Sequence, residues 1–260
     1  MISIENIRNF FPEVIRNEAR FRKYMLMEYL QLMILDHLSS SPWIRKLTFI
    51  GGTSIRLTRG IDRFSEDLDF DCKELTPEEF TAMTDGIVRF LNRSGFRTET
   101  RDQESTRLKA FRRSIIFPEL LFELGLSGHR EERFLVKVEA QDQLVHYIPE
   151  IAYIKGGGYF FPMPVPPAGV LSAMKVTAML DRRKGRDFYD VMFLLSQALP
   201  DFGFLMQRRR IPDMPTLKEA AEDVFNSVDL KVKRRDFEHL LFLPENSARI
   251  LHCREFFSNL

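Results

Sequence analysis

Three aspartates at alternating positions are the strongest chemical signal in this sequence. The string EDLDFD places them at Asp67, Asp69 and Asp71. Residues i and i+2 of a β-strand share a face, so the three carboxylates would lie opposite Leu68 and Phe70. Such carboxylates repel one another unless a cation neutralises them, and Mg²⁺ is commonly held by one or two carboxylates together with substrate phosphates. The pattern indicates a divalent-metal site, and the alternative is a solvated edge strand with an acidic face.

A glycine-rich turn lies sixteen residues before the first of these aspartates. Gly51, Gly52, Thr53 and Ser54 follow a short β-rich run and precede a helical turn. Glycine lets the backbone approach a ligand, and the first N–H groups of a helix are free to bind an anion. The segment could cradle a phosphate. The alternative is a tight turn in which a hydroxyl caps the helix.

A further acid stands on a clearly alternating strand at 133–141. Glu139 shares a face with Lys137, opposite Val136 and Val138. On a strand next to the aspartates it could complete a three-acid metal site with Asp67 and Asp69. Without that neighbour it would be an ordinary surface glutamate.

Positive charge is concentrated in the segment KVTAMLDRRKGRDFYD at 175–190. Lys175 and Arg182 are seven residues apart, which places them on one helical face and suits the binding of phosphates. Asp187 opens the next helix, where an acid also stabilises the first turn. The alternative for the cations is a solvated helix end. Three further cations belong to the segment: Arg183, Lys184 and Arg186.

The elements expected to position these residues alternate between helix and strand up to about residue 155. Apolar spacing predicts one long helix from Pro12 to Leu38, and Thr76-Pro77-Glu78-Glu79 is a helix-start signal. The other expected elements are a strand at 47–50, a helical turn at 54–59, a strand at 67–71, a helix to about Asn92, and strands at 97–100, 108–117 and 133–141.

A Gly- and Pro-rich segment at 156–169 is the best candidate for a boundary. Beyond it the spacing of apolar residues predicts helices at about 168–183, 187–198, 217–227, 233–242 and 246–258. A strand-rich half followed by a helical half predicts an α+β fold, divided into residues 1–155 and 156–260.

Composition excludes several classes of protein. The chain has 38 basic and 37 acidic residues, so a globally basic DNA-coating protein is not expected. Cys72 and Cys253 are too few for a disulfide framework, and reduced thiols are expected. The start of the chain does not have the pattern of a signal peptide, and the most apolar stretch, 24–38, is broken by polar residues. A cytoplasmic protein with no membrane partner is therefore expected.

The order and spacing of these motifs carry a family resemblance. A strand, then GGTS, then D-x-D resembles the signature of the nucleotidyltransferase superfamily with the DNA-polymerase-β-like palm. The longer string FIGGTSIRLTRGIDRFSEDLDF at 49–70, together with the segment at 175–190, closely resembles the AbiEii/AbiGii family of nucleotidyltransferase toxins. The resemblance covers roughly 45–200. It implies a palm made of a mixed sheet with flanking helices, followed by a helical C-terminal region.

The resemblance also implies roles for individual residues. Asp67 and Asp69 match the metal-binding pair, with Glu139 as a less secure third acid and Asp71 not needed. Lys175 would bind nucleotide and Asp187 would have a catalytic or structural role. The positions implied to contact the nucleotide are Gly51, Gly52, Thr53, Ser54, Arg63, Lys175, Arg182, Lys184 and Arg186. The acids would then face these cations across one cleft.

The activity implied is Mg²⁺-dependent transfer of NMP from an NTP to an acceptor hydroxyl, with release of pyrophosphate. The acceptor would be tRNA or another RNA, and the enzyme would be the toxin of a toxin–antitoxin or phage-defence system, neutralised by a cognate antitoxin. Two alternatives stay open. One is a nucleotidyltransferase that modifies a small molecule such as an aminoglycoside, and the other is a non-catalytic nucleotide- or RNA-binding module.

Overall fold

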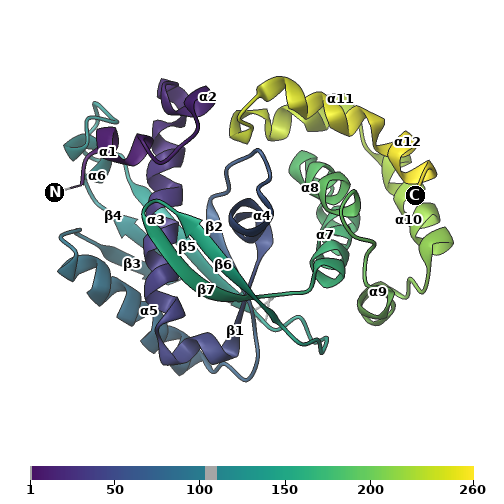
Figure 1. The fold of residues 1–260 in the computed structure, drawn as a ribbon, viewed down its shortest axis with the longest axis horizontal. Coiled ribbons are helices and arrows are strands. Elements are labelled where there is room, and N and C mark those ends of the chain that lie inside the picture. The colour runs from purple at the N-terminus through teal and green to yellow at the C-terminus, as the bar shows by residue number, and fades with distance from the viewer. Residues whose placement is uncertain (1, 103–109) are drawn as a thin grey trace. The chain divides into compact units, whose positions relative to one another are not determined.

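The computed structural model describes residues 2–102 and 110–260, which form two compact units (Figure 1). The sheet unit comprises Met1–Gly60, Phe64–Gln143 and Glu150–Val165. The helical unit comprises Ile61–Arg63, Leu144–Pro149 and Pro166–Leu260. The division predicted at residues 155 and 156 stays a prediction, and its position falls inside a strand of the sheet unit.

A five-stranded mixed sheet forms the centre of the sheet unit. Its order is β1-β2-β5-β4-β3. β2 runs parallel to β5, and the other neighbouring pairs are antiparallel. This mixed sheet with flanking helices confirms the predicted α+β class. The strands are β1 (Leu47–Ile50), β2 (Asp67–Cys72), β3 (Glu99–Asp102), β4 (Ala110–Phe117) and β5 (Phe134–Gln141).

The strand patterns behave as the sequence predicts. Along β5, buried and partly exposed residues alternate without interruption. The buried set, Phe134, Val136, Val138 and Ala140, belongs to the apolar core. The other face carries Lys137 and Glu139 toward solvent. A regular period of two therefore fixes which side chains of β5 are available for chemistry.

Helices flank this sheet. The longest are α3 (Arg22–Ser39) and α5 (Pro77–Arg93), and α4 (Gly51–Arg59) follows β1 directly. The predicted helix start at Thr76 begins α5, and it is a capping box: the Glu79 N–H donates to the Thr76 hydroxyl, and the Thr76 N–H donates to the Glu79 carboxylate. Three short helices complete the unit: α1 (Ile4–Arg8), α2 (Glu13–Arg16) and α6 (Leu120–Glu123).

The single helix predicted from Pro12 to Leu38 is wrong. The chain is helical at α2, leaves the helical path at Glu18 (φ −83°, ψ 117°), and resumes through a 3₁₀ turn before α3. The break buries Phe21 completely, with its ring centroid 5.6 Å from that of Phe64. Tertiary packing of one aromatic ring thus outweighs continuous helical spacing.

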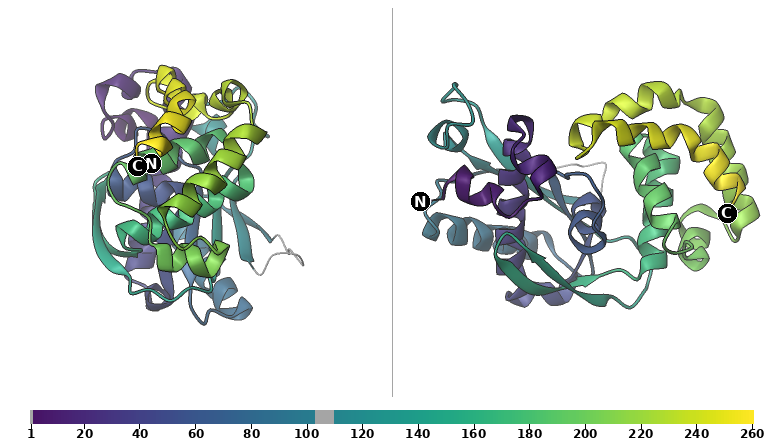
Figure 2. Two further views of the ribbon diagram at one scale, coloured as in Figure 1. Left: turned by 90° about the vertical axis from the view of Figure 1, so that its right-hand side faces the viewer. Right: turned by 45° about the horizontal axis from the view of Figure 1, so that its top comes forward.

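The Gly-rich part of the predicted boundary segment is the turn of a hairpin. β6 (Glu150–Gly156) pairs antiparallel with β7 (Tyr159–Val165), as Figure 2 shows. Gly157 and Gly158 have φ of +56° and +87°, the positive values that a two-residue hairpin turn requires. The sequence did not predict this hairpin, because Pro162 and Pro164 weaken the strand pattern of β7.

The helical unit is built on α7 (Ala168–Arg182) and α8 (Gly185–Leu195), which pack against each other (Figure 1). Between them the chain turns at Arg183 (φ +53°). Any Cβ at Gly185 would overlap the Lys233 carbonyl, so this close approach of two backbone segments needs glycine. The other α-helices are α9 (Phe202–Arg209), α10 (Met214–Ser227), α11 (Leu230–Lys233) and α12 (Cys253–Ser258).

Two predictions in this unit are wrong. The helix expected at 233–242 is a pair of 3₁₀ turns, because the backbone at Phe237 (φ −139°, ψ 0°) leaves the helical path while its ring is buried. The helix expected at 246–258 is a 3₁₀ helix (Pro244–His252) followed by α12. The sequence analysis also missed α9, although Asp201 caps its start.

No helix within the described ranges combines the length and apolar character that crossing a lipid bilayer demands. Cys72 and Cys253 are both free and buried.

Candidate active site

The outward face of β2 carries the predicted pair of carboxylates. Asp67 and Asp69 are partly exposed, whereas Leu68 and Phe70 on the other face are buried in the core. Asp71 differs from its neighbours: its side chain is 1% exposed and accepts a hydrogen bond from the Gln143 N–H at 2.9 Å. Asp71 is therefore not accessible on the outward face with Asp67 and Asp69. The accessible acidic group on β2 is the Asp67–Asp69 pair.

Gly51 brings a helix start directly against this pair. β1 pairs with β2 so that Ile50 lies opposite Asp69, and α4 begins at the next residue. Gly51 has φ +81°, and a Cβ added there would lie 2.8 Å from the Cβ and Cγ atoms of Asp69. Ile50, the residue before α4, makes no side-chain capping hydrogen bond. The start of α4 therefore lies against Asp69, and the N–H groups of a first helical turn can bind an anion.

The two hydroxyls of the Gly-rich turn are used inside the protein. Thr53 is buried and donates its hydroxyl to the Asp67 carbonyl at 2.5 Å. Ser54 is buried and donates to the Phe49 carbonyl at 2.9 Å. The prediction that these hydroxyls contact phosphates is therefore corrected: they tie α4 to β1 and β2. A phosphate-binding role for the helix start itself, including Gly51 and Gly52, stays a prediction.

Glu139 lies beside the pair, as predicted. Parallel pairing of β2 and β5 sets Asp69 opposite Glu139 and Asp67 opposite Lys137, and opposite residues on neighbouring strands share a face. The Glu139 carboxylate accepts from Arg112 Nε on β4 at 3.0 Å. Lys137 Nζ lies 3.5 Å from Asp67 Oδ1. Arg112 and Lys137, which are not among the residues of the family motif, thus offset part of the repulsion between the acids.

This arrangement corrects the predicted three-acid metal site. In residues 2–102 and 110–260, no three His, Cys, Asp or Glu side chains are grouped closely enough to hold a metal ion by themselves. The carboxylate of Glu139 is turned to Arg112. Asp67 and Asp69 still present hard oxygen donors on one partly exposed face. Two carboxylates suit Mg²⁺ that arrives with substrate phosphates, so the residues fit that ion.

Arg63 and Lys175 meet in a buried cluster of the helical unit. Arg63 Nε and Nη2 each donate to one oxygen of Asp190 at 2.7 Å, and Lys175 Nζ lies 2.8 Å from Asp190 Oδ2. Arg63 is 1% exposed and Asp190 is 0% exposed. Burial alone raises the pKa of Asp190, but the two cations outweigh burial and hold the pKa at about 2. Arg63 and Lys175 are thus both bound to Asp190, and the nucleotide-binding roles implied for them stay predictions.

The second half of the basic segment divides into buried and exposed residues. Asp187 is 0% exposed at the first turn of α8, where it accepts from Arg182 Nη2 at 2.6 Å and from the Lys184 N–H at 3.3 Å. Asp187 thus stabilises the helix start, in keeping with the structural alternative, and a catalytic role for it stays a prediction. Arg182 and Lys184 are exposed and Arg186 is half-buried, so these three cations are accessible to a ligand.

Asp62 accepts hydrogen bonds in the helical unit, and the sequence did not predict this role. Its carboxylate accepts from the Tyr189 hydroxyl and from Asn246 Nδ2, both at 2.7 Å. Burial and the hydrogen bond to Asp62 raise the pKa of Tyr189. With Arg63, these contacts bind the three-residue segment Ile61–Arg63 into the helical unit. Local sequence patterns do not indicate these contacts, because Tyr189 and Asn246 follow Asp62 by 127 and 184 residues in the chain.

The predicted site therefore has two parts. The sheet unit brings together Asp67, Asp69, Glu139 and the start of α4. The helical unit presents three accessible cations and a buried cluster. That the acids face these cations across one cleft stays a prediction.

Comparison with known proteins relates this arrangement to an enzyme family. A sequence model of the family described as "Nucleotidyl transferase AbiEii toxin, Type IV TA system" matches residues 33–241. Among curated protein sequences, none matches the chain.

Solved structures share the fold. MenT4, a nucleotidyltransferase toxin from Mycobacterium tuberculosis, is similar with a TM-score of 0.59 and 18% identity, covering 100% of this chain and 91% of that one. JHP933 from Helicobacter pylori is similar with a TM-score of 0.58 and 19% identity, covering 91% and 93% of the two chains. A structure described as a putative nucleotidyltransferase from H. pylori has a TM-score of 0.56 and 19% identity, with coverages of 89% and 94%.

Proposed function

Because the chain belongs to the AbiEii family of nucleotidyltransferase toxins, we propose that it transfers NMP from an NTP to a hydroxyl of an RNA acceptor, with Mg²⁺ held by Asp67 and Asp69. Membership in a family of type IV toxin–antitoxin systems implies an NTP substrate and an antitoxin. We place tRNA first among the acceptors, in a system that acts in phage defence.

One observation carries the proposal: the start of α4 lies directly against Asp69, one of the two partly exposed carboxylates of β2. Gly51 adjoins Asp69 so closely that no side chain fits between them. The N–H groups at the start of α4 suit the anionic oxygens of a triphosphate, and the carboxylates suit the cation that such a triphosphate carries. Both charges of a metal–nucleotide complex therefore have adjacent partners on one surface.

The reaction proposed is a displacement at the α-phosphorus of the NTP. The acceptor hydroxyl oxygen forms a bond to this phosphorus, the bond to the bridging oxygen of the β-phosphate breaks, and pyrophosphate leaves. When bound, Mg²⁺ supplies stabilisation of the negative charge that builds on the phosphate oxygens. Glu139 lies opposite Asp69 and is held on this face by Arg112. We assign Glu139 the acceptance of the hydroxyl proton.

The experiment is transfer of label from each of the four NTPs to total tRNA in the presence of Mg²⁺. Wild type is compared with Asp69→Asn, which keeps the size of the side chain and removes its charge. Asp223→Asn is a matched control, because Asp223 is exposed on α10. Label transfer and pyrophosphate release are expected from wild type and from the control, and not from Asp69→Asn.

The absence of pyrophosphate release from every NTP with wild-type protein, with or without RNA, would contradict the proposal. A second readout is growth after expression. Growth arrest that persists equally in Asp69→Asn would show that toxicity does not come from nucleotidyl transfer.

A further inference from the structure

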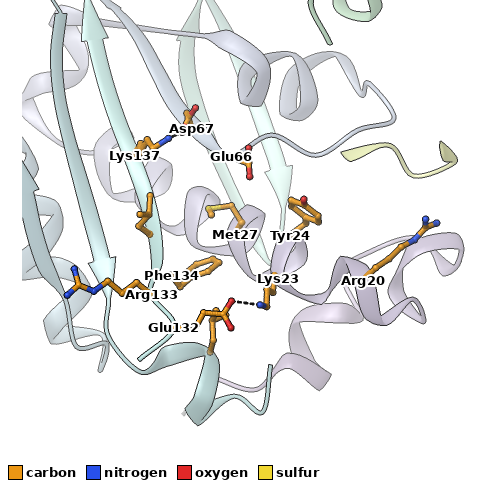
Figure 3. A pocket seen from close by; sticks show the side chains of 12 residues that line it. Arg20, Lys23, Tyr24, Met27, Glu66, Asp67, Glu132, Arg133, Phe134 and Lys137 are labelled. Atoms are coloured by element: carbon orange, nitrogen blue, oxygen red, sulfur yellow. Dashed lines mark hydrogen bonds and ion pairs between the residues drawn. The ribbon is translucent and has the colours of Figure 1, made fainter. Parts of the chain in front are cut away.

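The sheet unit contains a cavity of about 410 Å³ that extends from the acid pair (Figure 3). The start of β5, the start of β2 and the N-terminal part of α3 line it. Figure 3 shows Asp67 and Lys137 at one end, Arg20 at the other, and Met27 between them. Its volume falls in the range of about 300–1,000 Å³ that is usual for sites of small ligands or single nucleotides.

The place of this cavity separates it from the proposed triphosphate position. β1 and β5 are the two neighbours of β2 and lie on opposite sides of it. The triphosphate position is at the start of α4, which follows β1. The cavity is lined by Phe134, Leu135 and Lys137 of β5 and reaches Asp67. A group bound there would therefore approach the acid pair from the side opposite the NTP phosphates, as an acceptor must for displacement of pyrophosphate.

The charge of the cavity favours an anion. Four cations line it, Arg20, Lys23, Arg133 and Lys137, against three acids, Glu66, Asp67 and Glu132. Two of these cations have acidic partners in the lining: Lys23 Nζ donates to Glu132 at 2.5 Å, and Lys137 pairs with Asp67. Arg20 is half-exposed and only 3.9 Å from an exposed glutamate, Glu18. Arg133 is exposed and makes no ion pair within the described ranges.

A smaller hollow of about 260 Å³ adjoins this cavity and shares Arg20 and Lys23 with it. Arg22 is added there, and no acidic side chain lines it. The cations therefore continue beyond the space that one nucleotide fills. A small molecule has no use for such an extension, whereas the phosphates of a polynucleotide would follow it.

The walls of the cavity offer an apolar surface as well. Tyr24 is half-buried, and its ring is stacked on Phe64 with 5.4 Å between centroids and 17° between planes. Phe134 and Met27 form a buried floor. A supported aromatic ring beside cations is the combination on which single-stranded nucleic acid binds, because every base has a face that can stack.

We propose that this cavity binds the terminal nucleotide of an RNA acceptor, with its base against Tyr24 and the preceding phosphates along Arg20 and Arg133. The inference rests on the proposed function and deepens it, since it names where the acceptor binds. Residues 20–27 precede residue 33, where the family match begins. Arg133, in contrast, lies inside the family match, so the proposed acceptor site would combine residues from both parts of the chain.

The test separates acceptor binding from NTP binding. Arg133→Glu and Arg20→Glu are each expected to raise the KM for RNA by about 10-fold or more, the effect of a lost charge-assisted hydrogen bond. The KM for NTP is expected to stay unchanged. Arg89→Glu is the matched control, because Arg89 is exposed on α5 and does not line the cavity.

A second pair of variants tests stacking. Tyr24→Leu is expected to raise the KM for RNA by about 5-fold or more, whereas Tyr24→Phe keeps the ring and stays near wild type. A direct measurement accompanies the kinetics: equilibrium binding of a 5′-labelled single-stranded RNA oligonucleotide without NTP. Its salt dependence is expected to weaken in Arg133→Glu by a slope of about 0.7, the effect of one lost phosphate contact.

The outcomes distinguish this inference from the proposed function. RNA labelling with an unchanged KM for RNA in Arg133→Glu, Arg20→Glu and Tyr24→Leu would overturn the cavity as the acceptor site. Transfer to a small molecule or a protein but never to RNA would overturn the RNA assignment and leave nucleotidyl transfer intact. If wild type releases no pyrophosphate with any acceptor, the proposed function fails, and oligonucleotide binding still decides whether the cavity binds RNA.

Discussion

Two groups of carboxylates and cations in this protein contain the same residue types but have different roles, one proposed to be catalytic and one structural. On β2, Asp67 and Asp69 are partly exposed, and Lys137 lies 3.5 Å from one of them. In the helical unit, Asp190 is fully buried between Arg63 and Lys175 at 2.7–2.8 Å. The exposed acids can exchange one cation for another at small cost, whereas the buried acid cannot. Accessibility, more than residue identity, therefore distinguishes a reactive carboxylate from a structural one.

The largest expected effect is on catalysis at the exposed acids. Asp69→Asn should lower kcat by a factor on the order of 10³ while the free energy of unfolding changes little, because the residue is proposed to act on charge that develops in the reaction. The measurement is pyrophosphate release together with urea-induced unfolding. A large loss of stability in Asp69→Asn would contradict the contrast between the two groups.

The next effect is on stability at the buried acid. Asp190→Asn should destabilise the protein by about 3–5 kcal/mol, because it leaves the charges of Arg63 and Lys175 without their buried partner. Urea-induced unfolding measures the change. Wild-type stability combined with lost activity would instead assign Asp190 a direct part in the reaction.

Lowering the pH should reduce the stability that Asp190 contributes, which distinguishes it from the exposed acids of β2. The pKa of Asp190 is lowered to about 2 from an ordinary 3.8. The unfolded chain therefore binds a proton at higher pH than the folded one does, and the contribution of Asp190 is complete above about pH 5 and is lost as pH falls toward 2. Its contribution to the slope of stability against pH should reach about 1 kcal/mol per pH unit near pH 3.

The matched comparison uses Asp190→Asn and Asp69→Asn at pH 2–6. The first variant should have a shallower slope than wild type below pH 4, and the second should keep the slope that Asp190 provides. Equal slopes in wild type and Asp190→Asn would show that the carboxylate is not held ionised by its partners.

The smallest effect concerns the cation on the exposed face. Lys137→Met should change the free energy of unfolding by less than about 1 kcal/mol, since the side chain of Lys137 is 44% exposed and its ion pair is screened by water. Lys175→Met, measured by the same unfolding curve, should cost several times more. A similar loss of stability in Lys137→Met and Lys175→Met would show that burial does not determine how much each ion pair contributes.

Local patterns predict the exposed group well. Alternation along β2 and β5 places the side chains of Asp69 and Glu139 on outward faces, and the Gly51–Gly52 pair predicts a turn into a helix. These features depend on a period of two and on backbone freedom, which neighbouring residues express. The family motifs then supply the order in which strand, turn and acids occur.

The buried group is predicted poorly because its contacts are distant in sequence. Arg63 reaches Asp190 across 127 residues, and a motif that matches both positions does not reveal that they neutralise each other. The pairing of Arg112 with Glu139 depends in the same way on which strand lies beside β5. The helix break at Glu18 depends on the burial of Phe21. In each case tertiary packing determines the contact, and the local spacing of residues does not predict it.

The route of the chain through its two units has a consequence for dissecting the protein. The chain passes from one unit to the other at five points, and the segment Ile61–Arg63 belongs to the helical unit although both of its flanks belong to the sheet unit. A fragment that starts at Pro166 would lack Arg63 and Asp62, so Asp190 and Tyr189 would lose partners. The helical unit is therefore not a module that can be excised or fused elsewhere by a single cut.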